Sequence, residues 1–442
     1  MSAIAPLSPA RLPLSAFRLL GRNWAVLLFW FVASRAAHDL LLIGAAWVGQ
    51  RQKLLGLSVL SLAVLAVLAG TILMLYALRD SLPSLRRTPG PDAHRPDLGR
   101  RGELLHAVAE TILPFLVFYG AWGLFLDEAR DYSIEGLNQG GFGPTSALVL
   151  SFGDDWRALL VPLAVAVGTW IVRAVCERFH NKTGSRVLAV ATAVLEANWM
   201  LFAFAFVGTV FSQVSGWVTG RMFWHTAGTM IDATLHRLAL PQIAEVWQWF
   251  AGYLPDLRDG LLLPILWLTI TAVVYGEEVT SDGRLVEDSR RLNRVAGRAW
   301  ERLPGRAQVY SELFSREWRD KYVPFVNGLK LVLRGGAAFY LLFCLLYVLL
   351  KVATDWAWIG ATGLLGAHEW NWWWPRLPVL NFVRDGVYEV LRICLLAAAF
   401  DLSLRRIAAR RDAASRTART ASPTTAAPSG AASAPRPPAP GR

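Results

Sequence analysis

The chain has 442 residues, of which 54% are hydrophobic and 18% are charged, and its formal net charge is +12. Soluble domains are usually about 45–50% apolar. Here the charged residues gather between long apolar runs, which excludes an ordinary soluble protein and indicates one that crosses a membrane. The positive charge does not indicate nucleic-acid binding, because the basic residues lie in blocks beside the apolar runs.

A helix needs about 20 residues to cross a hydrocarbon core about 30 Å thick. Eight apolar runs meet or nearly meet this length. In chain order they are Asn23–Gly49, Leu54–Leu78, Leu104–Leu126, Ala158–Cys176, Val187–Phe211, Gly260–Gly276, Gly335–Ala353 and Phe382–Leu404. We therefore expect an all-α, polytopic membrane helix bundle of about eight transmembrane helices over residues 23–404.

The distribution of arginine and lysine predicts the orientation of the chain. Most of them lie in an N-terminal arm, residues 1–22, in the connecting segments 79–101, 173–186 and 277–334, and in the tail, residues 405–442. Basic segments favour the cytoplasmic side, so both termini are expected to be cytoplasmic. The tail is rich in Ala, Ser, Thr and Pro and lacks aromatic residues, which predicts disorder. Arginine greatly outnumbers lysine, as is typical of GC-rich bacteria, so a bacterial inner membrane is the expected location.

Two connecting segments are predicted to contain amphipathic helices that lie on the membrane surface. In the outer segment, 212–259, an apolar stripe opposes His225, Asp232 and His236. These three could bind zinc, but the polar face of such a helix requires the same residue types, so no metal is expected. In the inner segment, 277–334, arginines oppose an apolar stripe, and anionic inner-leaflet lipids should attract each of them by about 1 kcal/mol.

Other candidate motifs are weaker. Cys176, Cys344 and Cys394 lie in or beside apolar runs, as small buried hydrophobic residues do. The neighbouring acids Asp154 and Asp155 could hold a divalent ion. The sequence contains no phosphate loop, dinucleotide fingerprint, nucleophile elbow or His-Glu-x-x-His motif. No cofactor is therefore expected, and a membrane-embedded enzyme is the third choice of function.

Ionisable residues interrupt several apolar runs. Arg35, His38 and Asp39 lie close together in the first run, although a charge at the centre of a spanning helix costs about 2.5–3.5 kcal/mol. Arg35 and Asp39 are four residues apart and can therefore neutralise each other on one helix face. The other members of this predicted intramembrane polar cluster lie in the third, fifth and eighth runs: Glu110, Glu196, Asn198, Asp385, Glu389 and Arg392.

The deep charges in these runs do not cancel. Arg35 and Arg392 are outnumbered by four acids: Asp39, Glu110, Glu196 and Glu389. An excess of two negative charges in a low dielectric requires bound protons, a bound cation or water. The pattern predicts a polar cavity among the first, third, fifth and eighth runs, with His38 and Glu196 as proton-binding residues.

The first functional hypothesis is a transporter or permease-like protein that uses this cluster to handle protons or cations. The second is a non-catalytic envelope or assembly protein, in which the buried charges join helices and the loops and tail recruit partners. The lipid bilayer is the one partner that the sequence indicates directly, and it indicates no particular protein partner.

Overall fold

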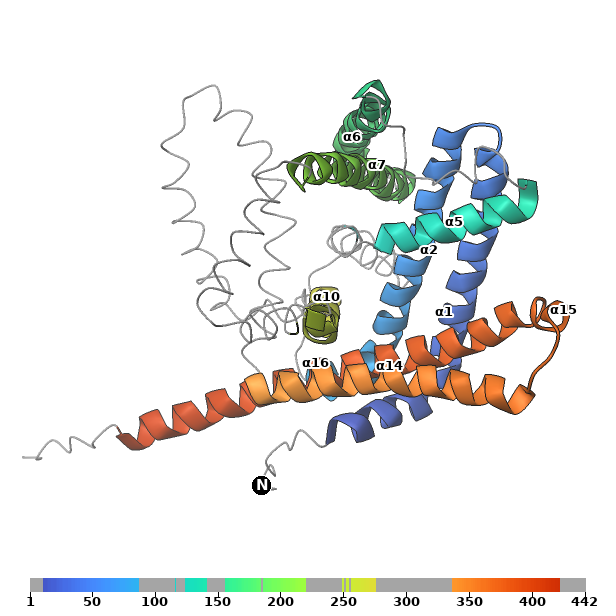
Figure 1. Ribbon diagram of the computed structural model, residues 1–442. Helices are drawn as coiled ribbons and strands as arrows, with labels where there is room; N and C mark the ends of the chain where they lie inside the picture. The colour runs from blue at the N-terminus through green and yellow to red at the C-terminus, as the bar shows by residue number, and fades with distance from the viewer. Residues whose placement is uncertain are drawn as a thin grey trace, which may run out of the picture.

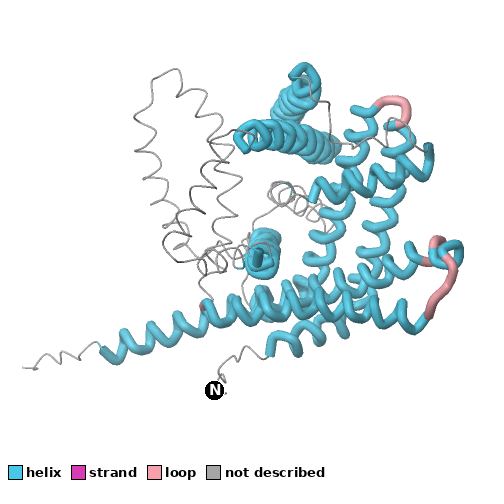
Figure 2. The backbone as a smooth tube through the Cα atoms, viewed as in Figure 1, coloured by secondary structure: helices cyan, strands magenta, loops and turns pink. Residues whose placement is uncertain are grey.

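A computed structural model describes residues 11–86, 116, 124–140, 156–183, 186–219, 249, 252–253, 256–275 and 336–421. Within these ranges every regular element is helical (Figure 2). The predicted all-α class is therefore confirmed for the part of the chain that the structure describes. Glu110, the outer residues 220–248 and the inner segment 277–334 lie outside it, as does almost all of the third predicted span.

Helices α1 (Arg11–Gly49) and α2 (Lys53–Leu78) form a hairpin and lie side by side (Figure 1). Small residues allow the two backbones to approach closely. A Cβ atom on Gly70 would lie 2.2 Å from the Cβ of Ser34, and one on Gly56 would lie 2.5 Å from the Cα of Gly49. After α2 the chain continues through a 3-10 turn, η1 (Arg79–Ser81), into the short helix α3 (Pro83–Arg86).

Helix α1 begins well before the predicted first span, so much of the predicted N-terminal arm is helical. The physical reason is an apolar stripe, Leu12, Ala16 and Leu19, whose members recur at helical spacing and are all buried. The basic residues Arg11, Arg18 and Arg22 lie within or beside this stripe, and they are the feature that suggests an arm outside the bundle.

Helix α5 (Leu124–Gly140) lies across α1 and α2 (Figure 1). It covers the end of the third predicted span and the residues that follow it, where the apolar runs predict no helix. Beyond it, α6 (Trp156–Thr183) and α7 (Arg186–Thr219) pack against each other as a second hairpin. Both helices are longer than the predicted fourth and fifth spans.

The C-terminal part contains α10 (Leu263–Val274), which follows a π-helical turn, η3 (Arg258–Leu262), and α14 (Ala337–Leu365). A short helix, α15 (Trp370–Trp373), connects α14 to the long α16 (Leu377–Ala421). Helix α16 thus continues beyond the predicted eighth span into the segment predicted as a disordered tail. Residues 422–442 lie outside the described ranges.

Five of the described helices are long and apolar enough to cross a membrane: Arg11–Gly49, Lys53–Ser81, Leu160–Phe179, Val190–Gly208 and Ala337–Leu365. The stretch Asp259–Val274 is apolar but shorter, and α16 is interrupted by charges. Several membrane-spanning helices are thus supported, whereas the number eight stays a prediction. The helices do not all run parallel, since α14 and α16 lie across α1 and α2 in Figure 1.

The close approach of α1 and α2 can be tested at Gly70. Gly70→Ala places a Cβ against Ser34, and such overpacking typically costs about 1–3 kcal/mol. Gly44→Ala is the matched control, because nothing lies within 4 Å of its added Cβ. Thermal unfolding in detergent, followed by tryptophan fluorescence, should show a lower Tm for the first variant only. Equal Tm values for the two variants would contradict the packing.

Candidate functional site

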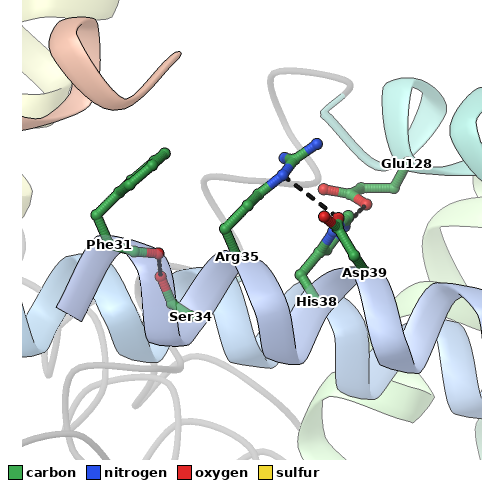
Figure 3. Close-up of polar contacts among 6 residues, drawn as sticks. All are labelled: Phe31, Ser34, Arg35, His38, Asp39 and Glu128. Carbon is green, nitrogen blue, oxygen red and sulfur yellow. Dashed lines mark hydrogen bonds and ion pairs between the residues drawn. The ribbon is translucent and has the colours of Figure 1, made fainter. Parts of the chain in front are cut away.

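The polar residues of α1 meet an acid from α5. Nδ1 of His38 lies 2.9 Å from Oδ1 of Asp39, and Nε2 lies 2.8 Å from Oε2 of Glu128 (Figure 3). Nε of Arg35 lies 3.3 Å from the same Oδ1 of Asp39. Figure 3 shows the three α1 side chains on one side of the helix, with Glu128 reaching toward them from α5. The predicted association of Arg35, His38 and Asp39 is therefore observed in the structure.

Burial differs sharply among these groups. The His38 side chain is 1% exposed and that of Glu128 is 11% exposed, whereas the Asp39 side chain is 49% exposed. A buried polar group is costly unless it is hydrogen-bonded. His38 meets this requirement through both ring nitrogens: Nδ1 faces the half-exposed Asp39, and Nε2 faces the nearly buried Glu128.

Glu128 is the site residue that the sequence prediction missed, because it follows the third apolar run, where the hydropathy pattern predicts no helix. A signal was nevertheless present: Phe125, Ala129 and Tyr132 recur at helical spacing, and all three are buried. Glu128 lies on the same stripe, so a helical reading of this segment would have directed its carboxylate toward the bundle. Its partner, 90 residues away in the chain, could not have been found from spacing.

Helix α5 brings a further acid close to this site. Burial removes water from the Asp131 carboxylate and raises its pKa above the usual value, and the negative charge of Glu128 raises this pKa further. The positive charges of Arg35 and His38 act in the opposite direction. The contact between α1 and α5 is thus rich in acids, and these two bases lie among them.

In α16, the predicted cluster residues Asp385, Glu389 and Arg392 belong to two separate ion pairs. Asp385 accepts hydrogen bonds from Arg384, whereas Glu389 lies 2.6 Å from Arg392. The Arg392 side chain is 9% exposed, and its guanidinium lies 4.0 Å from the centre of the Trp267 ring in α10. It also hydrogen-bonds to Tyr347 of α14. Arg392 therefore joins three helices through charge, hydrogen bonding and a cation–π contact.

The first and eighth predicted spans come together where α1 crosses α16. Phe31 packs on Phe382 with ring centres 5.3 Å apart, and a Cβ on Gly386 would lie 2.9 Å from the Phe31 ring. One turn further along each helix, the charges of Arg35 and Glu389 interact. We refer to the resulting series of six residues as the charge chain: Glu128, His38, Asp39, Arg35, Glu389 and Arg392.

Glu196 and Asn198 of the fifth predicted span lie in α7, where both are buried. Oε2 of Glu196 is 2.6 Å from Nε of Arg173 in α6, and its Oε1 accepts a hydrogen bond from Trp199. Arg173 also contacts Glu177 one turn along its own helix. Glu196 thus belongs to the contact between α6 and α7, which differs from the predicted proton-binding partnership with His38.

The predicted excess of two negative charges does not count Arg173 or Glu128. Arg173 lies where the fourth predicted span meets the basic segment 173–186, and its side chain is 2% exposed inside the α6–α7 hairpin. Three ion pairs account for six deep charges of the described residues: Arg35–Asp39, Arg173–Glu196 and Arg392–Glu389. Asp401 of α16 is also buried and pairs with Arg405. Glu128 differs from these acids, because it meets a histidine, whose charge depends on a proton.

No protein-family model matches this sequence, and no curated protein or solved structure matches the chain. Within the described ranges, no group of three or more His, Cys, Asp or Glu side chains is arranged to hold a metal ion.

The Arg173–Glu196 pair predicts a specific loss of stability. Arg173→Met removes the guanidinium from a buried carboxylate, and breaking a buried pair in this way costs about 3–5 kcal/mol. Arg173→Met combined with Glu196→Leu should recover much of that loss, because neither charge remains. Denaturant titration of the protein in micelles measures both effects.

Arg384→Gln is the matched control for this experiment. Its pair with Asp385 is about one-third exposed, and pairs of that kind contribute about 0–1 kcal/mol. If Arg173→Met cost no more than Arg384→Gln, the buried ion pair would not be a main support of α6 and α7.

Proposed function

We propose that the protein is a multi-pass membrane transporter or permease-like protein, and that the charge chain is where it handles a proton or a small cation. The observation that carries the proposal is that ionisable side chains of α5 and α1 contact one another, and that Arg35 of α1 lies within electrostatic range of the Glu389–Arg392 pair of α16. Ionisable residues inside apolar helices are costly, and they commonly mark ion or proton pathways.

The surroundings of the chain support this proposal. The part of helix α1 that follows Arg22 is otherwise mostly apolar, and many of its large side chains are exposed in the structure, including Trp24, Phe29 and Trp47. Such a surface suits contact with lipid, and the tryptophans suit the headgroup layers. A polar series behind a lipid-facing apolar surface is the arrangement that a conducting or exchanging protein needs.

The proposal includes a location and an orientation. The five apolar helices favour a membrane location. The bacterial inner membrane, cytoplasmic termini and binding of anionic lipids to residues 277–334 follow from the distribution of basic residues.

A second function, that of a non-catalytic envelope or assembly protein, is favoured by a different observation. The carboxylates of Asp39 and Glu389 each have an arginine within 3.3 Å. Each pair lies within a single helix, so its charges compensate each other without a proton or a cation. In that case the charge chain would have a structural role and would exchange nothing.

Proton flux into liposomes separates the two functions. Purified protein is reconstituted with a pH-sensitive dye trapped inside, and an outward potassium gradient with valinomycin supplies the driving potential. We expect faster acidification than in protein-free liposomes, and we expect Glu389→Gln to return the rate to the protein-free level, because it interrupts the charge chain.

Asp355→Asn is the control, since Asp355 is an exposed carboxylate on α14 away from the chain. It should leave the flux unchanged. Parent protein that gives no flux above protein-free liposomes would contradict the transport proposal and favour the assembly function.

A further inference from the structure

We propose that the contact between α1 and α5 is a binding site for one proton, held on His38 as an imidazolium between Asp39 and Glu128. The hydrogen bonds of the protonated ring would help to hold α5 against α1. The inference goes beyond transport, because a protein that moves nothing across the membrane could still hold this proton.

The His38 ring needs two N–H donors to hydrogen-bond to both carboxylates. Both ring nitrogens of His38 face carboxylate oxygens, at 2.9 and 2.8 Å. An ionised carboxylate only accepts hydrogen bonds, and a neutral imidazole has one N–H to donate. With neutral His38, one of the two contacts would set a nitrogen lone pair against a carboxylate oxygen. Two good hydrogen bonds therefore require one additional proton.

That proton belongs on the imidazole. In water the ordinary pKa is about 6.5 for histidine and about 4.3 for glutamate, so the ring is the stronger base. Asp39 is half exposed and also contacts Arg35, and both features favour its ionised form. An imidazolium can donate to Asp39 and Glu128 together, and such charge-assisted bonds are the stronger kind.

Each element packed against α1 contributes to the charge around this ring. Helix α2 has a single charged residue, Lys53, at its first position. Helix α16 contributes Glu389, which acts on Arg35. Glu128 of α5 contacts the ring directly, and Asp127, Asp131 and Tyr132 are its titratable neighbours on that helix. Acids outnumber bases at this contact, which favours a proton being retained there.

The bound proton has a mechanical consequence for α5. Phe125 packs against Phe204 of α7, Tyr132 lies against Gly56, and the side-chain amide of Gln139 donates to the carbonyl oxygen of Ile43. These contacts do not depend on pH. When the proton leaves, the ring keeps one N–H, which only one of the two carboxylates can accept. Deprotonation should therefore weaken the contact between α1 and α5 at His38, while α5 stays attached through its other contacts.

Nitrogen-15 NMR of the histidine rings tests the proposal directly. The full chain, labelled at its seven histidines, is studied in bicelles between pH 5 and 9. The His38 signal is identified by its loss in His38→Gln. We expect both of its ring nitrogens to carry hydrogen at pH 7. A neutral His38 ring at pH 7, with one unprotonated nitrogen, would overturn the proposal.

Two variants of α5 complete the test. Glu128→Gln removes one of the anions that hold the proton, so the His38 titration midpoint should move to lower pH. Glu135 lies on the same helix, and its carboxylate accepts hydrogen bonds from Asn138 and Gln139. Glu135→Gln is the control, and it should leave the His38 titration midpoint unchanged. Equal midpoints in both variants would contradict the assigned contact.

If His38→Gln does not fold, the His38 signal is identified instead as the one that survives in each of the single His→Gln variants at the other six histidines. The result is independent of the flux measurement. An imidazolium at His38 in a protein without flux would uphold the proton site and reject transport, whereas flux with a neutral His38 would do the reverse.

Discussion

The described structure depends on the pairing of charges that are removed from water. A buried ion that loses its partner is strongly destabilising, because the low-dielectric interior cannot replace its hydration. A pair that joins two helices, as Arg173–Glu196 does, therefore fixes one helix against the other. Arg392 shows this most fully, since its contacts with Trp267 and Tyr347 bring α10 and α14 onto α16. In the same way, Asp401 of α16 accepts the backbone N–H of Ser84 in α3 and also contacts Arg405.

Close packing of small residues sets the geometry within which these charges meet. Gly70 and Gly56 allow α1 and α2 to touch at backbone distance, and Gly386 makes room for Phe31 where α1 crosses α16. The ring of Phe31 lies one turn before Arg35, so the same crossing that packs the aromatic rings brings Arg35 and Glu389 within electrostatic range. Sterics and electrostatics therefore favour the same arrangement of α1 and α16.

The sequence predicted the parts of this arrangement that depend on local spacing. The helical class, the apolar runs and the i, i+4 pairing of Arg35 with Asp39 follow from periodicity. Arg173 shows where such reasoning failed. A basic residue near the end of an apolar run was used as the mark of a loop, yet α6 continues through it because Glu196 neutralises it inside the hairpin. That pairing depends on tertiary structure, which a hydropathy window does not contain.

Glu128 shows a second limit, since its role depends on α5 folding back across α1, and residues between them in the chain give no sign of this. The most direct test of the account is a double-mutant cycle between His38 and Glu128, using His38→Gln and Glu128→Gln and unfolding free energies measured in micelles at pH 7. The account predicts a coupling energy of about 1.5–3 kcal/mol, as for a hydrogen bond that involves a charged group. A coupling near zero would mean that the two side chains do not support each other, and the account would be wrong.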